Sequence, residues 1–310
     1  MSSWLIAVII VSCVVFLVGF WFLSGYIAFL LTLRKGSIAG KIINGTMKRN
    51  IKSYQIDYSW WDSQQSEKLL LNKNGNTLSA TLIKNEGSKK VAILVHGIFG
   101  THKDLQPQAK ILLENGFNIL APDLRAHGET TGKEISMGNF EKDDVVDWTN
   151  EMVERFGKDC QIVLLGISMG GATVLLTSGE NLPKNVKCVV SDSGYSNAGK
   201  ELKFVVNRAL VPSFIILPQL NFFLKRLSLF DLNKVQPIEA VKTTNLPILF
   251  IHGNKDSFVP CKMSKEMFDV SNKEICELEI FDGAIHIQSF ATDNDRYAKT
   301  LLNFVNKWVS

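Results

Sequence analysis

Apolar and polar positions follow one another along most of this chain in blocks that predict strands alternating with helices. Short, largely apolar runs, typical of buried strands, lie at 91–95, 117–121, 162–165, 186–191, 248–251 and 275–281. Stretches with helical spacing separate them, at 105–114, 140–156, 168–178, 262–270 and 297–308. This alternation predicts an α/β fold with a mostly parallel sheet and helices on both of its faces.

A hairpin is expected before the first of these strands. The runs Lys68–Leu71 and Thr77–Ile83 flank the dipeptide Asn74-Gly75, which is typical of a type I′ turn. We therefore expect two antiparallel strands at the start of a domain that extends over residues 67–310.

One long segment interrupts the alternation. More than 50 residues separate the strand that ends near Ser191 from the one that begins at Ile248, although a crossover needs only one helix. The segment is rich in phenylalanine and leucine, and Pro212 and Pro218 break it into pieces. It predicts a small helical lid at about residues 196–243.

The N-terminal segment is apolar on every side. Residues 4–33 include no charged side chain, and about 20 apolar residues at about 1.5 Å each cross the hydrocarbon core of a bilayer. A core helix would show a polar face, so residues 4–33 predict a transmembrane anchor. A cleaved signal peptide is the alternative, because Ser37-Ile38-Ala39 resembles a cleavage site. Against it, no basic residue precedes the apolar run, which is longer than the apolar region of a signal peptide.

Charge sets the expected orientation of that anchor. Nothing basic precedes it except the amino terminus, and it is followed by the basic residues Arg34, Lys35, Lys41, Lys48, Arg49 and Lys52. The positive-inside rule then predicts a single-pass membrane protein whose C-terminal domain is cytoplasmic. Residues 34–66 would form a linker, and its positive charge would attract anionic lipid head groups.

Composition narrows the functions further. The net charge of +4 is small and no arginine-rich stripe follows the linker, so we expect no nucleic-acid partner. The five cysteines include no C-x-x-C pair, so we expect no zinc or other metal site. Nearly half of the residues are apolar, which suits a large folded core.

The residues with the clearest chemical meaning follow the strand at 162–165. The run Gly166-Ile167-Ser168-Met169-Gly170 places a serine between a buried strand and a helix, which is the context of a nucleophile elbow. The glycines leave room for a crowded turn that projects the serine hydroxyl, and the helix directs its positive end toward nearby negative charge. Ser168 is therefore the predicted nucleophile.

A serine nucleophile needs a histidine base and a carboxylate that orients it. In the fold that carries this elbow the chain order is serine, acid, histidine, which leaves His252 and His286 of the five histidines. His252 ends a strand, whereas His286 follows the last strand in a flexible loop, so His286 is the predicted base. For the acid we favour Asp256, which follows a strand at the edge where such sheets place their sites, with Asp192 as the alternative. Asp282 would have to fold back sharply to reach His286.

An oxyanion hole needs two backbone N–H groups near the serine. Met169 is expected to supply one because it follows the nucleophile directly. Ile98 is the predicted second donor, in the glycine-containing loop His96–Gly100. His96 is expected to brace that loop. The run Asp123–Gly128 is expected to be structural, with its aspartate and its arginine paired.

Together these motifs resemble the α/β-hydrolase superfamily. The HGIFG loop, DLRAHG, GISMGG, the IHGNKDSFVP segment and the GAIH loop occur in its order and spacing, from about residue 68 to the C-terminus. Residues 247–260 and 191–195 are most similar to prolyl-oligopeptidase-like and serine-aminopeptidase-like hydrolases, many bacterial members of which carry an N-terminal membrane anchor. The chain lacks the β-propeller of true prolyl oligopeptidases, and its serine differs from the aspartate nucleophile of haloalkane dehalogenases and epoxide hydrolases. The resemblance implies a triad and two oxyanion donors, namely Ser168, Asp256 and His286 with Ile98 and Met169.

The predicted reaction is transfer of an acyl group to water from an ester, thioester or amide, without a metal or organic cofactor. The apolar lid favours a carboxylesterase with an apolar acyl substrate, and the candidate substrate contacts are Phe99, Tyr195, Phe204 and Phe214. A membrane-anchored serine peptidase or amidase is the alternative, and a non-catalytic binding protein on the same fold is a second one. The expected partners are the substrate and, through the N-terminal helix, membrane lipid.

Overall fold

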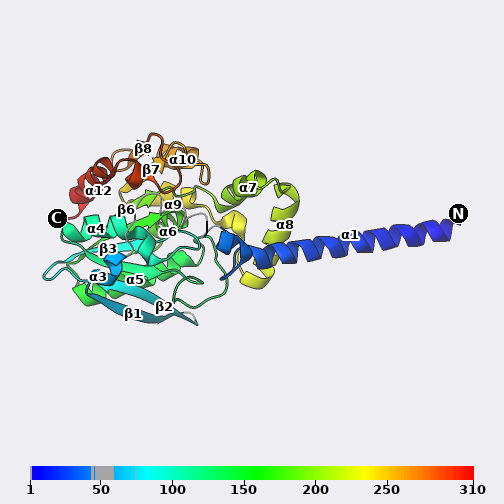
Figure 1. Cartoon of the computed structure of the whole chain (residues 1–310), viewed down its shortest axis with the longest axis horizontal. Coiled ribbons are helices and arrows are strands. Elements are labelled where there is room, and N and C mark those ends of the chain that lie inside the picture. Colours follow the sequence, from blue (N-terminus) through cyan, green and yellow to red (C-terminus); the bar gives the residue numbers. More distant parts are fainter. Residues whose placement is uncertain (1, 43–44, 46–58, 74) are drawn as a thin grey trace.

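One large sheet with helices on both sides forms the body of the molecule in the computed structural model, which describes residues 2–42, 45, 59–73 and 75–310 (Figure 1). In these residues the sheet has eight strands in the order β1-β2-β4-β3-β5-β6-β7-β8. β2 runs antiparallel to β1 and to β4, and the other neighbouring pairs are parallel, which confirms the predicted mostly parallel sheet. The strands are β1 (Ser66–Lys73), β2 (Asn76–Ile83), β3 (Lys90–Val95), β4 (Asn118–Asp123), β5 (Gln161–Ile167), β6 (Val186–Asp192), β7 (Ile248–Gly253) and β8 (Glu277–Phe281).

Helices precede, separate and follow these strands. Before the sheet lie α1 (Ser3–Leu31) and α3 (Ser59–Ser63). The helices of the domain body are α4 (Gln106–Glu114), α5 (Glu141–Phe156), α6 (Met169–Ser178), α9 (Pro237–Thr243), α10 (Lys262–Val270), α11 (Ser289–Thr292) and α12 (Asn294–Trp308). Between β6 and β7 the chain also forms α7 (Ala198–Arg208), α8 (Ser213–Phe223), the π-helical turn η2 (Leu224–Ser228) and the 3-10 turn η3 (Leu232–Lys234). The expected helical lid is therefore a helical insert in this crossover.

The sheet is buried on both faces, each over its own apolar core. On one face α4 and α12 pack against strand residues such as Leu94, and Tyr297 and Phe304 of α12 are fully buried. On the other face α5, α6 and α10 pack against strand residues such as Ile93, with Trp148 of α5 in the same core. Burial on both faces explains why the central strands read as continuous apolar runs.

Most elements lie within a few residues of their predicted positions. The last predicted strand begins at Glu277 rather than at residue 275, and a 3-10 turn (η1, His102–Leu105) precedes α4. The predicted hairpin pairs β1 with β2, and Lys73 lies opposite Asn76. Asn74 itself lies outside the described residues. Short local signals thus located the strands, while element ends shifted by up to three residues.

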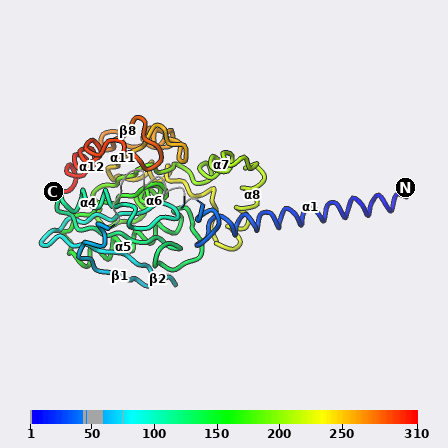
Figure 2. Tube along the Cα trace, viewed as in Figure 1, coloured from blue at the N-terminus to red at the C-terminus, as the bar shows by residue number. Residues whose placement is uncertain are grey.

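α1 projects from the body as one long helix (Figure 2). Its most apolar 18-residue window has a mean hydropathy of 2.9, and none of that window is buried. By length and composition α1 is therefore long and apolar enough to cross a membrane. Beyond it, Arg34 pairs loosely with Glu134 at 3.8 Å, and Lys35 donates to the carbonyl oxygen of Gly128 at 3.0 Å. The other basic residues that set the predicted orientation include Lys48, Arg49 and Lys52, which lie outside the described residues.

Candidate active site

Ser168 lies in the tight turn between β5 and α6. Its backbone has φ 54° and ψ −120°, a positive-φ conformation that few residues other than glycine adopt. A Cβ at Gly166 would overlap the carbonyl oxygen of Gly170, and a Cβ at Gly170 would overlap that of Val95. Only hydrogen fits at these two positions. The turn therefore places the serine at the carboxyl end of β5 with its backbone tightly constrained.

His286 connects this serine to a carboxylate. It lies in the loop after β8, and its Nε2 is 2.9 Å from the Oγ of Ser168. Its Nδ1 is 2.7 Å from the Oδ2 of Asp256. These partners assign the hydrogens: the serine hydroxyl donates to Nε2, and Nδ1–H donates to the carboxylate. The structure thus brings Ser168, His286 and Asp256 into one chain of hydrogen bonds.

Asp256 is held in place just after the carboxyl end of β7. Its Oδ1 accepts hydrogen bonds from the backbone N–H groups of Phe258 at 2.8 Å and Val259 at 2.9 Å. Its side chain is fully buried. Burial alone would raise the pKa of this carboxyl, but the neighbouring charge of His286 and the hydrogen bonds from His252 and His286 hold the pKa well below its usual range. Asp256 is therefore ionised at neutral pH, which is the state that a carboxylate needs in order to orient a histidine base.

His252 contacts the same carboxylate from its other side. Its Nε2 is 3.1 Å from the Oδ2 of Asp256 and 3.0 Å from the carbonyl oxygen of Val259. Because both partners are acceptors, Nε2 carries the hydrogen, and Nδ1 accepts from the hydroxyl of Ser264 at 2.7 Å. The sequence suggested this histidine only as a rival base. The contact between His252 and Asp256 could have been inferred from the sequence, because the two residues are four positions apart at the end of a strand.

The other two candidate acids have different partners. Asp192 accepts hydrogen bonds from the hydroxyls of Tyr297 and Ser193, each at 2.9 Å. Asp282 accepts from the side chain of Asn254 at 2.5 Å. Within the described part of the chain, neither carboxylate hydrogen-bonds to His286. Asp192 instead ties β6 to α12 in the interior.

Met169 and the loop that contains Ile98, which carry the two predicted oxyanion donors, lie next to Ser168. Met169 is the first residue of α6, directly after the serine. The loop that contains Ile98 also approaches closely, since a Cβ at Gly97 would lie 3.3 Å from the Cβ of Ser168. Among the residues that the structure describes, neither the N–H of Ile98 nor that of Met169 donates to another protein group. Two unused donors beside a serine hydroxyl suit an oxygen that gains negative charge.

Two buried histidines hold that loop. His96 donates from Nδ1 to the carbonyl oxygen of Gly97 at 2.7 Å, and its Nε2 accepts from the N–H of Leu124 at 3.0 Å. The Nε2 of His127 accepts from the N–H of Phe99 at 2.8 Å. Burial lowers the pKa of His96 to about 3 and lowers the pKa of His127 as well. Both rings are therefore neutral at physiological pH and act as fixed braces.

The expected pair between Asp123 and Arg125 is wrong. Arg125 instead makes a two-pronged contact with Asp144 of α5, with Nε–Oδ2 at 2.8 Å and Nη2–Oδ1 at 2.5 Å. Asp123 accepts from Nδ1 of His102 at 2.9 Å and from the N–H of Glu129 at 3.0 Å. β4 ends at Asp123 and the chain turns there, so the two side chains leave toward different neighbours. Both contacts still tie loops together beside the site.

The four candidate substrate contacts lie in different environments. Tyr195 is fully buried and donates its hydroxyl to the carbonyl oxygen of Met137 at 2.9 Å, so in this structure it supports the core and is out of reach of a substrate. Phe99 packs close to Gly40, where an added Cβ would lie 2.9 Å from its ring. Phe204 of α7 is half-buried, whereas Phe214 of α8 is exposed on the lid. The structure does not gather these side chains into one pocket wall.

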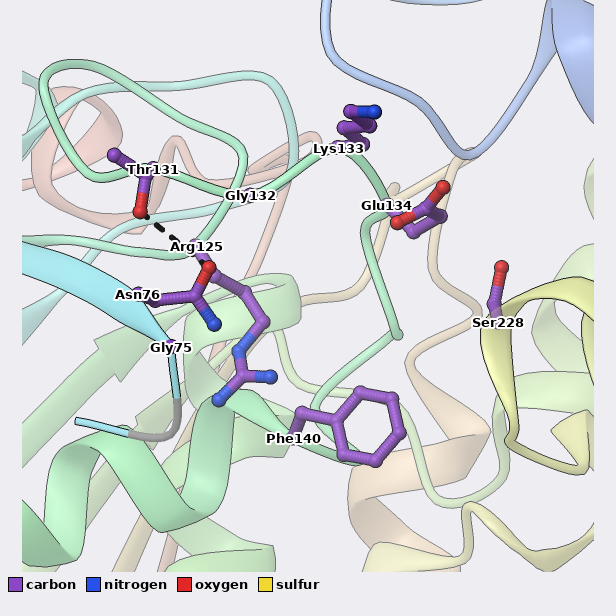
Figure 3. Close-up of a pocket in the computed structure, with 9 residues that line it drawn as sticks. All are labelled: Gly75, Asn76, Arg125, Thr131, Gly132, Lys133, Glu134, Phe140 and Ser228. Atoms are coloured by element: carbon purple, nitrogen blue, oxygen red, sulfur yellow. Dashed lines mark hydrogen bonds between the residues drawn. The ribbon is translucent and has the colours of Figure 1, made fainter.

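A separate cavity of about 390 Å³ lies between the β1–β2 turn, the loop after β4 and the lid (Figure 3). In it the guanidinium of Arg125 lies 5.1 Å from the centre of the Phe140 ring. None of its lining residues belongs to the Ser168 hydrogen-bond chain. Across the described residues, no group of three or more histidine, cysteine, aspartate or glutamate side chains is arranged to hold a metal ion. The lining residues are Gly75, Asn76, Arg125, Thr131, Gly132, Lys133, Glu134, Phe140 and Ser228.

The amino-acid sequence is similar to one family model and to several known proteins. A family model described as the alpha/beta hydrolase fold matches residues 91–214, which include the Ser168 turn. The chain is 26% identical over 215 residues to the uncharacterized protein YqkD of Bacillus subtilis, covering 69% of this chain and 70% of that protein. It is 23% identical over 274 residues to monoglyceride lipase of Homo sapiens, covering 78% of this chain and 89% of that protein.

Solved structures agree on the fold. The esterase Pf2001 of Pyrococcus furiosus superposes with a TM-score of 0.65 at 23% sequence identity, covering 81% of this chain and 96% of that one. At this identity the likeness establishes the architecture and leaves the substrate open. The strand order, the serine turn and the family match all agree: the chain has the α/β-hydrolase fold.

Proposed function

We propose that the chain is a serine hydrolase, and specifically a carboxylesterase that acts on an apolar acyl group. The observation that carries this proposal is the hydrogen-bond chain from the Oγ of Ser168 through His286 to Asp256, with distances of 2.9 and 2.7 Å. The unused N–H groups of Ile98 and Met169 support it. A monoglyceride lipase and an esterase among the similar proteins favour an ester over an amide.

In the acylation step, the Nε2 of His286 takes the proton of Ser168 as its Oγ attacks the ester carbonyl carbon. The carbonyl oxygen becomes an oxyanion, which accepts hydrogen bonds from the N–H groups of Ile98 and Met169. Asp256 stabilises the imidazolium that forms. The bond to the alkoxy oxygen then breaks, and His286 gives its proton to the leaving alcohol.

Deacylation repeats these steps with water as the nucleophile. His286 takes a proton from the water as its oxygen attacks the acyl-enzyme carbonyl, and the same two N–H groups hold the second oxyanion. Collapse of this intermediate releases the carboxylic acid and returns the proton to the Oγ of Ser168. The proposed chemistry consumes one ester and one water and yields an acid and an alcohol.

We also propose that α1 anchors the chain in a membrane, as a single pass with the catalytic domain on the cytoplasmic side. The support is the length and apolar composition of α1 and the basic residues that follow it. Membrane lipid would then be a partner of the chain through α1, beside its acyl substrate.

A substrate panel tests the proposed activity. The full chain and its Ser168→Ala variant are assayed in detergent micelles against p-nitrophenyl esters of increasing acyl length and against aminoacyl anilides. We expect the wild type to hydrolyse the esters, with kcat/KM higher for medium chains than for acetate, and the variant to be inactive. Faster cleavage of the anilides would reassign the chain as an amidase or peptidase. A folded wild type that cleaves neither class would make it a non-catalytic member of the fold.

A further inference from the structure

The lid carries an unusually exposed apolar surface. Four side chains at the junction of α7 and α8 form what we term the lid patch: Leu210, Val211, Phe214 and Ile215. Leu210 is 92% exposed and Phe214 is 79% exposed. Large apolar side chains that cluster in solvent mark a surface that another phase or partner covers.

The lid also packs directly against α1. The ring of Phe222 lies 5.8 Å from that of Trp21 and 5.5 Å from that of Phe22, centre to centre. The hydroxyl of Ser24 donates to the side-chain oxygen of Gln219 at 3.1 Å. At Gly25 an added Cβ would lie 2.7 Å from the Cβ of Gln219, so the two helices touch closely there. α8 is therefore fixed at one level along α1.

The length of α1 indicates where α8 lies relative to the hydrocarbon core of the bilayer. The helix has 29 residues, whereas about 20 residues at about 1.5 Å each cross the hydrocarbon core. A span that begins at Ser3 ends near Phe22, where contacts with the lid begin. The remaining turns up to Leu31 then lie outside the hydrocarbon, and α8 lies at the bilayer surface.

The arrangement of the elements places the lid patch at the same level. α8 crosses α1, and the α7–α8 end of the lid is the part of the body that extends furthest along α1 toward the N-terminus (Figure 1). Arg208, an exposed basic residue at the end of α7, lies two residues before Leu210 of the patch. An apolar surface next to a basic side chain is typical of segments that lie in the interface between head groups and acyl chains.

The backbone of Leu210 supports a role for this surface. Its φ is 59°, in the region where glycine and asparagine are usual and a branched apolar residue is rare. The positive φ is sterically unfavourable, and the exposure of the leucine is unfavourable in water. Insertion into an apolar phase would offset the exposure.

We infer that the lid patch docks into the surface of the bilayer that α1 spans, so that the lid is held at the interface by its own apolar contacts as well as by α1. This inference rests on the proposed membrane anchoring. It identifies the occupant of the patch as lipid. A second copy of the chain would bury the patch against protein instead.

Depth measurements on spin-labelled protein test this. The full chain is reconstituted in liposomes with Cys13 and Cys261 replaced by alanine, since the other cysteines are buried, and a nitroxide is attached at Phe214→Cys. Leu70→Cys in the same background is the matched control, an exposed apolar residue on the edge strand β1. We expect the ratio of oxygen to nickel-chelate accessibility to be several-fold higher at position 214 than at position 70.

Two outcomes overturn the inference. Equal ratios at 214 and 70 would place the lid patch in water. A second copy of the chain would cover the patch if the label at 214 were shielded from both reagents. Its spectrum would then also show dipolar broadening that disappears on dilution with unlabelled protein. A label on Cys13, with only Cys261 replaced, tests the anchor separately. If Cys13 is deep while 214 is in water, the anchoring proposal stands and the inference alone fails, whereas a Cys13 in water contradicts both.

Discussion

The backbone of Ser168 is held in an unusual conformation by the elements on either side of it. Its positive φ costs on the order of 1–3 kcal/mol relative to a relaxed turn. Hydrogen bonds on both sides hold it there: its N–H donates to the carbonyl oxygen of Asp192 at 2.8 Å, and its carbonyl oxygen accepts from the N–H of Ala172 at 3.0 Å. The stable sheet and α6 therefore maintain a local conformation that serine alone would not keep.

The position of His252 predicts a measurable effect on turnover. In His252→Ala, the carboxylate of Asp256 loses a donor and orients His286 less well. Because a hydrogen bond to a charged group contributes about 1.5–3 kcal/mol, we expect kcat to fall roughly 10- to 100-fold, with little change in KM. Steady-state kinetics on a p-nitrophenyl ester measure this. His102→Ala is the matched control, since His102 contacts Asp123 and lies outside the triad; an equal fall in both variants would contradict a positioning role.

Glu201 of α7 predicts how stability depends on pH. It is buried, neither of its carboxyl oxygens has a hydrogen-bond partner among the described residues, and burial together with the nearby charge of Asp256 raises its pKa from 4.5 to about 8. The unfolded chain therefore releases this proton at lower pH than the folded chain does. Stability is lost as pH rises from about 4.5 to about 8, and the full cost is present above that window.

Glu201→Gln removes this cost because the amide stays neutral. Since one pKa unit corresponds to about 1.4 kcal/mol, we expect the variant to be stabilised by a few kcal/mol at about pH 9 and little at about pH 4. Thermal unfolding of both proteins at the two pH values measures the difference. An equal change in Tm at both would show that Glu201 does not titrate in this window.

At the level of single residues, the sequence predicted most of the hydrogen-bond chain around Ser168 because chain order and strand ends restrict the choices. It selected His286 and Asp256, which the structure brings together. It did not predict the contact between His252 and Asp256, because that contact depends on how the turn after β7 folds. The predicted pair between Asp123 and Arg125 was wrong for a similar reason, because the spacing of two residues in the sequence does not determine the directions of their side chains in a turn.

At the level of elements, contact between α1 and α8 depends on a glycine. At Gly25 there is no room for a side chain next to Gln219, whereas at Gly19, six residues earlier in the same helix, an added Cβ meets nothing within 4 Å. Small residues allow two helix backbones to approach each other this closely. A substitution at Gly19 therefore serves as a control for the same substitution at Gly25, because only the second one disturbs the packing of α1 against α8.

We expect Gly25→Leu to push α8 away from α1 and to speed amide hydrogen exchange in Ser213–Phe223. Gly19→Leu should leave exchange there unchanged. Mass spectrometry of the full chain in lipid nanodiscs measures both. Unchanged protection of α8 in Gly25→Leu would mean that α1 does not hold the lid.

The elements themselves were largely predictable, because strands buried on both faces must be apolar throughout and the helices between them must show one apolar side. The lid was recognisable as an insert by its length. Its docking against α1 was not predictable, because two segments about 190 residues apart give no local signal of contact.

At the level of the whole molecule, the proposed anchor and its flanking charge predict topology. A green fluorescent protein fused after Ser310 should fluoresce and an alkaline phosphatase fused there should be inactive, because the first requires the cytoplasm and the second requires export. Activity of the phosphatase fusion with a dark fluorescent fusion would reverse the orientation.

The proposal that Ser168 is an activated nucleophile is tested most directly by covalent labelling. The folded full chain is incubated with a fluorophosphonate, which reacts with serines activated by a neighbouring base, and the modified peptide is identified by mass spectrometry. We predict one label, on Ser168, that is lost in Ser168→Ala and greatly reduced in His286→Ala. A folded wild type that stays unlabelled, or a label on another serine that persists in Ser168→Ala, would contradict the proposed function.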